Sequence, residues 1–252
     1  MAIEPARWIA IKNRYPIGTR VRGTVMHLED FGAFVRLDHD DVAALVLVTN
    51  IEDGTRSLDM HDYPQIGSVV EATVVDLIEE TAQVRLSMRP SDLRRHASAH
   101  LQTIVARLAD AGLAMAHDVR GCSAHDIAEL EGALGVTLPV AYRVFLEKMG
   151  CSAGRFLTGT DVRLDTLRSL KPDAARLLRE CAPSLVLTPT AFVFAVHQGY
   201  EFLFFECGPS GDPPVFLFTE GEQTFRRVAE TFSAWLDGCV SDEIAAYDAL
   251  GE

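Results

Sequence analysis

His96 and His100 stand four residues apart in a stretch with helical character. This spacing puts both imidazoles on one side of a helix, where they could hold a metal ion. No third ligand-type side chain is positioned beside them, and Arg94 and Arg95 adjoin them. A solvated helix face is therefore the preferred interpretation, and we expect no metal site.

His197 and Cys207 end two successive apolar segments, so a histidine could activate a thiol across the hairpin between them. Nothing in the sequence supplies an oxyanion hole or a third group that would orient the histidine. His197 is better explained as a half-buried structural histidine. We therefore expect a protein that is not an enzyme and that carries no cofactor.

The cysteines are odd in number and widely spaced, with no C-x-x-C pair: Cys122, Cys151, Cys181, Cys207 and Cys239. This pattern is typical of reduced thiols in a cytosolic protein and not of a disulfide framework or a zinc site.

Composition and length favour an ordinary globular protein of two domains, with 252 residues of which 48% are hydrophobic and 23% charged. No apolar run approaches the roughly 18–20 residues of a membrane span, and the first residues lack the pattern of a secretory signal. We expect a cytoplasmic protein without membrane contact. The net charge of −13 argues against a protein that binds polyanions such as nucleic acids over much of its surface.

Periodicity divides the chain into a β-rich first half and a mixed second half. Period-two alternation predicts five strands, at about 19–28, 32–38, 43–49, 69–76 and 82–88. Helical spacing of Leu101, Ile104 and Leu108 predicts a connecting helix over 92–112.

The second half has helical patterns on both sides of three predicted strands. A capping-box variant at Ser123 and Asp126 starts one helix, and Pro139 starts another. Residues 164–180 look helical, in one piece or in two because of Pro172. An antiparallel meander is predicted at 191–197, 201–206 and 214–218, and a last helix at 223–238. This order is typical of an α+β architecture.

These patterns predict the following organisation: an N-terminal arm with Trp8 and Ile9 at 1–15, a barrel domain at 16–90, a helix and linker at 91–120, an α+β domain at 121–243 and a C-terminal tail at 244–252.

The segment Asp30-Phe31-Gly32-Ala33-Phe34-Val35 lies in a frame that includes Gly18, Gly23 and Val25 before it and Ile66-Gly67, then Val84-Arg85-Leu86-Ser87, after it. That order over 16–90 resembles the ribosomal S1-type RNA-binding domain, a five-stranded OB barrel. The resemblance implies that Phe31 and Phe34 lie on the outer sheet surface and stack on bases of single-stranded RNA. Strand parity then allows Arg22, Arg36 and Arg85 to face outward and meet phosphates.

Other positions depart from the S1 pattern, which puts RNA binding in question. The usual histidine, glycine, basic residue and lysine are replaced by Leu47, Ala44, Gln83 and Thr24. Residues 16–90 also hold six arginines, no lysine and thirteen acidic residues, which leaves a net charge of −7. The alternative is that Phe31 and Phe34 form a protein-binding patch or pack against the second domain.

The run from Ile127 through Leu134-Gly135 and Leu138-Pro139 to Phe145-Leu146 resembles the opening of the SUKH superfamily, which includes Smi/Knr-type regulators and bacterial immunity proteins. Thr231-Phe232-Ser233-Ala234-Trp235-Leu236 is similar to its closing helix. The resemblance implies a non-enzymatic domain that binds a protein partner, often a nuclease toxin. Residues 124–243 carry ten basic and seventeen acidic residues, and such a surface could steer a basic partner.

Taken together, the sequence predicts a bacterial SUKH-type immunity protein that neutralises a toxin and carries an S1-like OB domain for an RNA or protein contact. The alternative is an RNA-binding regulator associated with ribosomes or transcripts, in which the SUKH-like domain serves as protein adaptor.

Overall fold

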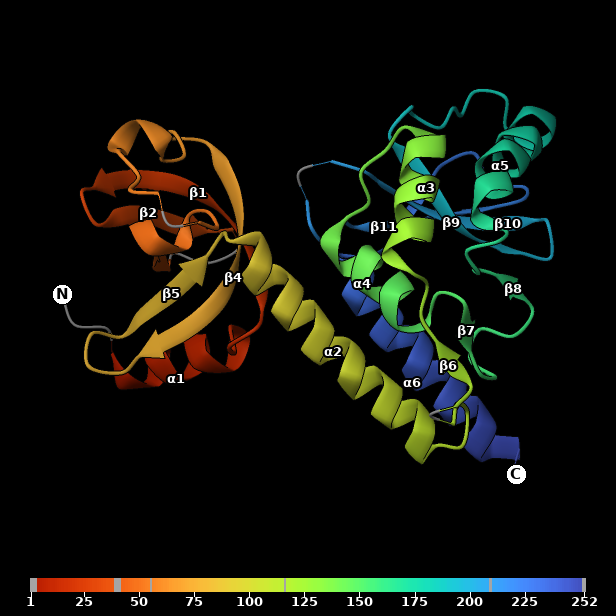
Figure 1. The fold of residues 1–252 in the computed structure, drawn as a ribbon, viewed down its shortest axis with the longest axis horizontal. Coiled ribbons are helices and arrows are strands. Elements are labelled where there is room, and N and C mark those ends of the chain that lie inside the picture. Colours follow the sequence, from red (N-terminus) through yellow and green to blue (C-terminus); the bar gives the residue numbers. More distant parts are fainter. Residues whose placement is uncertain (1–3, 39–41, 55, 116, 209, 251–252) are drawn as a thin grey trace. The chain divides into compact units, whose positions relative to one another are not determined.

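The computed structural model describes residues 4–38, 42–54, 56–115, 117–208 and 210–250. The chain forms two compact units, Met1–His96 and Ala97–Glu252. The boundary falls within helix α2 (Pro90–Asp110), and each unit is described by itself below (Figure 1). None of the helices in the described ranges combines the length and the apolar character needed to cross a membrane.

The first unit is a closed barrel with the strand order β1-β2-β3-β5-β4. Its strands are β1 (Arg20–Glu29), β2 (Gly32–Leu37), β3 (Ala43–Leu47), β4 (Val69–Ile78) and β5 (Gln83–Ser87). β3 and β5 pair in parallel and the other neighbours pair antiparallel. The five strands lie where the alternation predicts them, and the prediction of an OB barrel is confirmed.

Alternate side chains fill the barrel, as period-two geometry requires. Val25, Val35, Val46, Val74 and Leu86 are all almost completely buried. The expected N-terminal arm contains helix α1 (Pro5–Arg14). Trp8 and Ile11 are its buried residues, whereas Ile9 is 56% exposed.

The second unit has a five-stranded antiparallel sheet with the order β12-β11-β10-β9-β8. Its strands are β8 (Thr160–Asp161), β9 (Ala191–His197), β10 (Glu201–Glu206), β11 (Val215–Thr219) and β12 (Arg226–Ala229). The meander prediction for β9, β10 and β11 is confirmed. A separate two-stranded sheet, β6 (Val119–Arg120) with β7 (Ser152–Ala153), lies outside the sequence predictions.

Four further helices belong to the second unit: α3 (Ala124–Leu134), α4 (Val140–Met149), α5 (Leu167–Cys181) and α6 (Phe232–Leu250). The predicted capping box of α3 is present, since Ser123 and Asp126 bond to each other's backbone amides. α5 is one helix despite Pro172. The prediction of an α+β domain is confirmed.

The second unit's core is rich in aromatic rings. Tyr142 of α4 lies 5.8 Å from Phe194 of β9, 5.2 Å from Phe205 of β10 and 5.2 Å from Phe232 of α6, measured between ring centroids. Rings at such distances interact favourably beyond the area they bury. The cluster therefore joins two helices to the sheet.

The helix predicted over 223–238 is wrong in its first part. Residues 226–229 form edge strand β12 and the helix begins only at Phe232. The Thr231 hydroxyl accepts a hydrogen bond from the Ala234 amide at 3.0 Å, which caps the helix there. Helix α6 continues to Leu250, through much of the predicted C-terminal tail.

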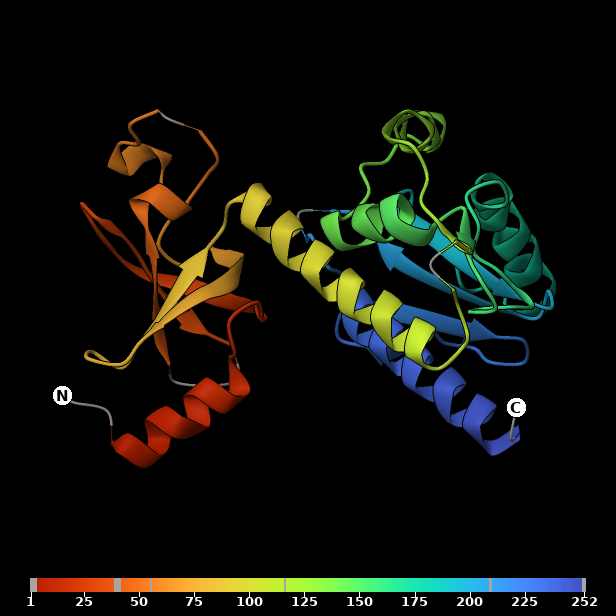
Figure 2. The ribbon, with the colours of Figure 1, turned by 60° about the horizontal axis from the view of Figure 1, so that its bottom comes forward.

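The C-terminal part of α2 belongs to the second unit's core, where Leu101, Ile104 and Leu108 are fully buried. α2 and α6 run side by side in both views (Figures 1 and 2). The Asp237 carboxylate of α6 accepts hydrogen bonds from His100 at 2.8 Å and Arg107 at 3.0 Å. The expected helical stripe is therefore the buried side of a helix pair.

Candidate nucleic-acid interface

The turn between β1 and β2 presents two aromatic side chains together. Phe31 is 50% exposed, and its ring meets the half-buried ring of Phe34 edge-on with centroids 6.2 Å apart. Two hydrogen bonds fix the turn: Tyr63 Oη donates to the Asp30 carbonyl at 2.8 Å, and the Val48 amide donates to the Phe31 carbonyl at 2.9 Å. The structure thus places both predicted aromatics on one outer patch.

His27 extends this patch, which the sequence prediction missed. Val25 points into the barrel, so simple alternation would turn His27 inward as well. The register shifts between Val25 and His27, and the bulge brings His27 opposite Phe34 with ring centroids 6.3 Å apart. His27 Nε2 lies 2.7 Å from a Glu29 carboxylate oxygen, which holds the imidazole in place.

A row of paired residues crosses the outer surface from β2 to β5. Phe34 is opposite Leu45 of β3, and Leu45 is opposite Arg85 of β5. Neighbouring strands lie about 4.8 Å apart, so the backbones of Phe34 and Arg85 are roughly 10 Å apart. Leu45 is only 3% exposed, although it does not belong to the core cluster inside the barrel. Leu45 therefore supplies a buried apolar side chain between Phe34 and Arg85 in this row.

Several basic side chains of the barrel unit are paired with carboxylates. The ion pairs include Lys12–Glu79 at 2.6 Å, Arg95–Asp92 at 2.8 Å, Arg20–Glu71 at 2.9 Å, Arg89–Asp53 at 3.0 Å, Arg56–Asp62 at 3.1 Å and Arg22–Asp38 at 3.6 Å. Within the described residues no ion pair joins Arg36 or Arg85 to an acidic group, and Arg85 Nη1 is buried there without a hydrogen-bond partner. These two guanidinium groups retain a charge that a ligand could neutralise.

The predicted basic residues are therefore not equivalent. Arg36 is exposed on β2 opposite Thr24, two residues from Phe34. Arg85 lies in the same cross-strand row as Phe34. Arg22 is farther along β1, opposite Glu71, and faces Asp38. The structure brings Phe31, Phe34, Arg36 and Arg85 to one surface, to which we add His27; these five residues are the aromatic–arginine face.

His96 and His100 lie on one helix, α2, but their side chains make different contacts. Instead of a solvated face, His96 is half-buried in the barrel unit, and a Cβ at Gly18 would be 3.2 Å from its Nδ1. Burial lowers the pKa of His96. His100 contacts Asp237 in the second unit. Among the described residues no group of three or more ligand-type side chains could hold a metal ion.

His197 and Cys207 lie at opposite ends of the β9–β10 hairpin. His197 is opposite Glu201 next to the turn, whereas the Cys207 amide donates to the Thr190 carbonyl at the far end. A thiol–imidazole pair across this hairpin is therefore ruled out. His197 instead lies 3.2 Å from the Thr160 hydroxyl and is half-buried, as predicted.

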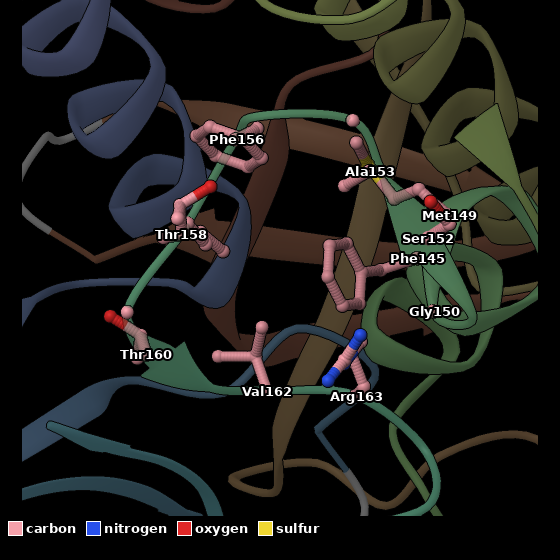
Figure 3. Close-up of a pocket in the computed structure, with 13 residues that line it drawn as sticks. Phe145, Met149, Gly150, Ser152, Ala153, Phe156, Thr158, Thr160, Val162 and Arg163 are labelled. Carbon is pink, nitrogen blue, oxygen red and sulfur yellow. The ribbon is translucent and has the colours of Figure 1, made fainter. Parts of the chain in front are cut away.

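The second unit contains a cavity of about 380 Å³ beneath the segment that follows α4. Figure 3 shows Phe145, Val162 and Arg163 turned toward its open centre, with Phe156 at the edge. Leu157, also in its wall, has a positive φ of 58°, and its amide donates to Glu243 at 3.0 Å. Burial raises the pKa of Glu243.

Comparisons with known proteins identify both units. Residues 14–89 match the model of the S1 RNA binding domain, and residues 121–238 match the model of the SMI1/KNR4 family (SUKH-1). Both resemblances inferred from the sequence are confirmed.

Individual relatives cover the first domain. Small ribosomal subunit protein bS1 of Pseudomonas aeruginosa is 37% identical over 82 residues, which are 32% of this chain and 14% of that protein. The bS1 protein of Coxiella burnetii is 30% identical over 82 residues, or 15% of its length. The chain thus matches about a seventh of these relatives. The solution structure of GSP13 from Bacillus subtilis is 28% identical and covers 31% of this chain and 58% of that chain, with a TM-score of 0.28.

Proposed function

We propose that this chain, which joins an S1 RNA-binding domain to a SUKH-1 domain, is a non-enzymatic binding protein whose barrel holds single-stranded RNA on the aromatic–arginine face. The matched relatives named above are proteins of the small ribosomal subunit, which is in keeping with an RNA ligand. The SUKH-1 domain would bind a protein partner.

The observation that carries this proposal is the exposed contact of Phe31 with Phe34 beside two guanidinium groups without acidic partners among the described residues. Stacking of one base on an aromatic side chain contributes about 1–3 kcal/mol. Arg36 and Arg85 can meet the phosphates between stacked bases, and His27 offers a third ring. This local arrangement matters more than the domain's net charge, because phosphate contacts act over short distances at physiological salt.

Fluorescence anisotropy of a single-stranded RNA of about ten nucleotides tests the proposal, because one OB domain covers about 4–16 nucleotides. The Phe31→Ala/Phe34→Ala double variant removes two stacking surfaces and should weaken binding at least about 30-fold. Ile17→Ala is the matched control, since Ile17 is 57% exposed and precedes the opposite end of β1. Equal affinity of the double variant and wild type would exclude this face as the RNA site.

The acidic second domain supports a more specific candidate function. Its charge of −7 over residues 124–243 is complementary to a basic partner such as a nuclease toxin, which favours neutralisation of that toxin. If a toxin gene adjoins the gene for this chain, co-expression of the chain with that toxin should restore growth. Unrelieved toxicity would leave a regulator with a different protein partner as the better proposal.

A further inference from the structure

Two cysteines that are 29 residues apart in the sequence meet beside the small β6–β7 sheet. In that sheet Arg120 is opposite Ser152, and the Cys151 amide donates to the Arg120 carbonyl at 3.0 Å. The Cys122 amide donates to the Leu146 carbonyl at 2.8 Å. These bonds hold the two segments together, and Cys151 Sγ lies 2.8 Å from Cys122 Sγ.

The backbone leaves the two thiols little room to separate. Gly121, directly before Cys122, runs so close to α4 that a Cβ there would be 1.8 Å from the Glu147 carbonyl oxygen. A disulfide has an S–S bond of about 2.05 Å. The two sulfurs therefore need to approach by less than about 1 Å to become bonded.

The two thiols differ in their access to a reagent. Cys151 is half-buried and lines a second cavity, of about 580 Å³, through which a reagent can reach its thiol. Cys122 is only 7% exposed, and burial, followed by the contact with Cys151, raises the pKa of its thiol. Cys151 is thus the sulfur that attacks first.

We propose that Cys122 and Cys151 are a reversible disulfide site, oxidised by exchange with a small-molecule disulfide. The Cys151 thiolate attacks one sulfur of that disulfide and releases the first small thiolate. Cys122 then gives its proton to solvent, and its thiolate attacks the Cys151 sulfur and displaces the second small thiolate. The protein sulfurs lose two electrons, the small disulfide gains them, and the two thiol protons end on the two small thiols.

This linkage has a defined structural consequence. Gly150 and Ser152, on either side of Cys151, line the cavity of Figure 3, while Cys151 lines the neighbouring one. The bond would tie the wall between these cavities to the segment before α3. Oxidation would therefore restrict the movement of Cys151 and its two neighbours relative to the segment before α3.

Thiol counting on the reduced full-length protein tests this site. The folded chain is incubated with oxidised glutathione and is then denatured in the presence of N-ethylmaleimide, which alkylates free thiols. The N-ethylmaleimide adducts are counted by intact mass. Two of the five cysteines should escape alkylation, peptide mapping should link Cys122 to Cys151, and dithiothreitol should restore both thiols. Five adducts on the oxidised folded protein, or a linkage between other cysteines, would overturn the proposal.

Single substitutions test the order of attack. Cys122→Ser should accumulate glutathione on Cys151, because the resolving thiol is missing, whereas Cys151→Ser should accumulate none on buried Cys122. Cys181→Ser is the matched control, because Cys181 is half-buried and faces Glu220 at 3.6 Å, and it should keep the linkage. Stable glutathione on Cys122 in the Cys151→Ser variant would contradict the assigned order.

Discussion

Arg22 and Arg36 are both exposed arginines on the outer surface of the barrel, yet their surroundings differ. Arg22 faces the Asp38 carboxylate at 3.6 Å, whereas Arg36 has no acidic partner among the described residues. A ligand phosphate must displace Asp38 to reach Arg22, but it can neutralise Arg36 directly. The value of an arginine to RNA binding thus depends on its partner as well as on its exposure.

Arg36→Ala should therefore weaken RNA binding more than Arg22→Ala. Because Arg36→Ala removes one phosphate contact, the slope of log K against log salt should also become less steep by about 0.7 for single-stranded RNA. Anisotropy titrations of both variants over about 50–200 mM salt measure this difference. Equal losses in the two variants would show that the Arg22–Asp38 ion pair does not restrict the ligand.

At the scale of elements, the β1–β2 turn depends on its close approach to β3. Gly32 has a φ of +156°, and a Cβ there would be 2.1 Å from the Val46 carbonyl oxygen. The absence of a side chain lets the two strands pair directly after Phe31. This contact fixes where the turn, and with it the Phe31 ring, lies on the barrel.

Gly32→Ala should lower the free energy of unfolding by about 3–4 kcal/mol, because both the backbone conformation and the contact with Val46 are disturbed. Gly54→Ala is the control. Gly54 has a φ of +133°, and a Cβ there would have no atom within 4 Å, so only about 1–2 kcal/mol of backbone strain is expected. Chemical denaturation measures the free energy of unfolding of the two variants. Equal losses in the two variants would show that the Val46 contact is unimportant.

The elements also show where sequence patterns succeed and fail. Alternation located the five barrel strands because each has one face in the core. Strict alternation would assign His27 to the wrong face, because a bulge between Val25 and His27 reverses the parity of the residues that follow. The helical spacing of Phe225, Val228 and Phe232 concealed strand β12, which pairs antiparallel with the preceding strand β11. The meeting of Cys122 with Cys151 arises from tertiary structure, which no local pattern in the sequence reports.

At the scale of the whole molecule, an acidic chain carries a surface on which two arginines, Arg36 and Arg85, have no ion pair among the described residues. The net charge is −13, and the S1 domain contributes −7 of it over residues 16–90. At 0.15 M salt the Debye length is about 8 Å, so distant carboxylates are largely screened from a bound strand. The domain can therefore bind RNA if Arg36 and Arg85 contact phosphates directly, and the number of such contacts should be small.

The most direct test of this account is the salt dependence of RNA affinity for wild type and for the Arg36→Ala/Arg85→Ala double variant. Two phosphate contacts predict a slope of about −1.4 in log K against log salt for the wild-type protein. The double variant should bind more weakly, with a slope near zero. A wild-type protein that fails to bind RNA at about 50 mM salt, or a slope that the double substitution leaves unchanged, would contradict the account.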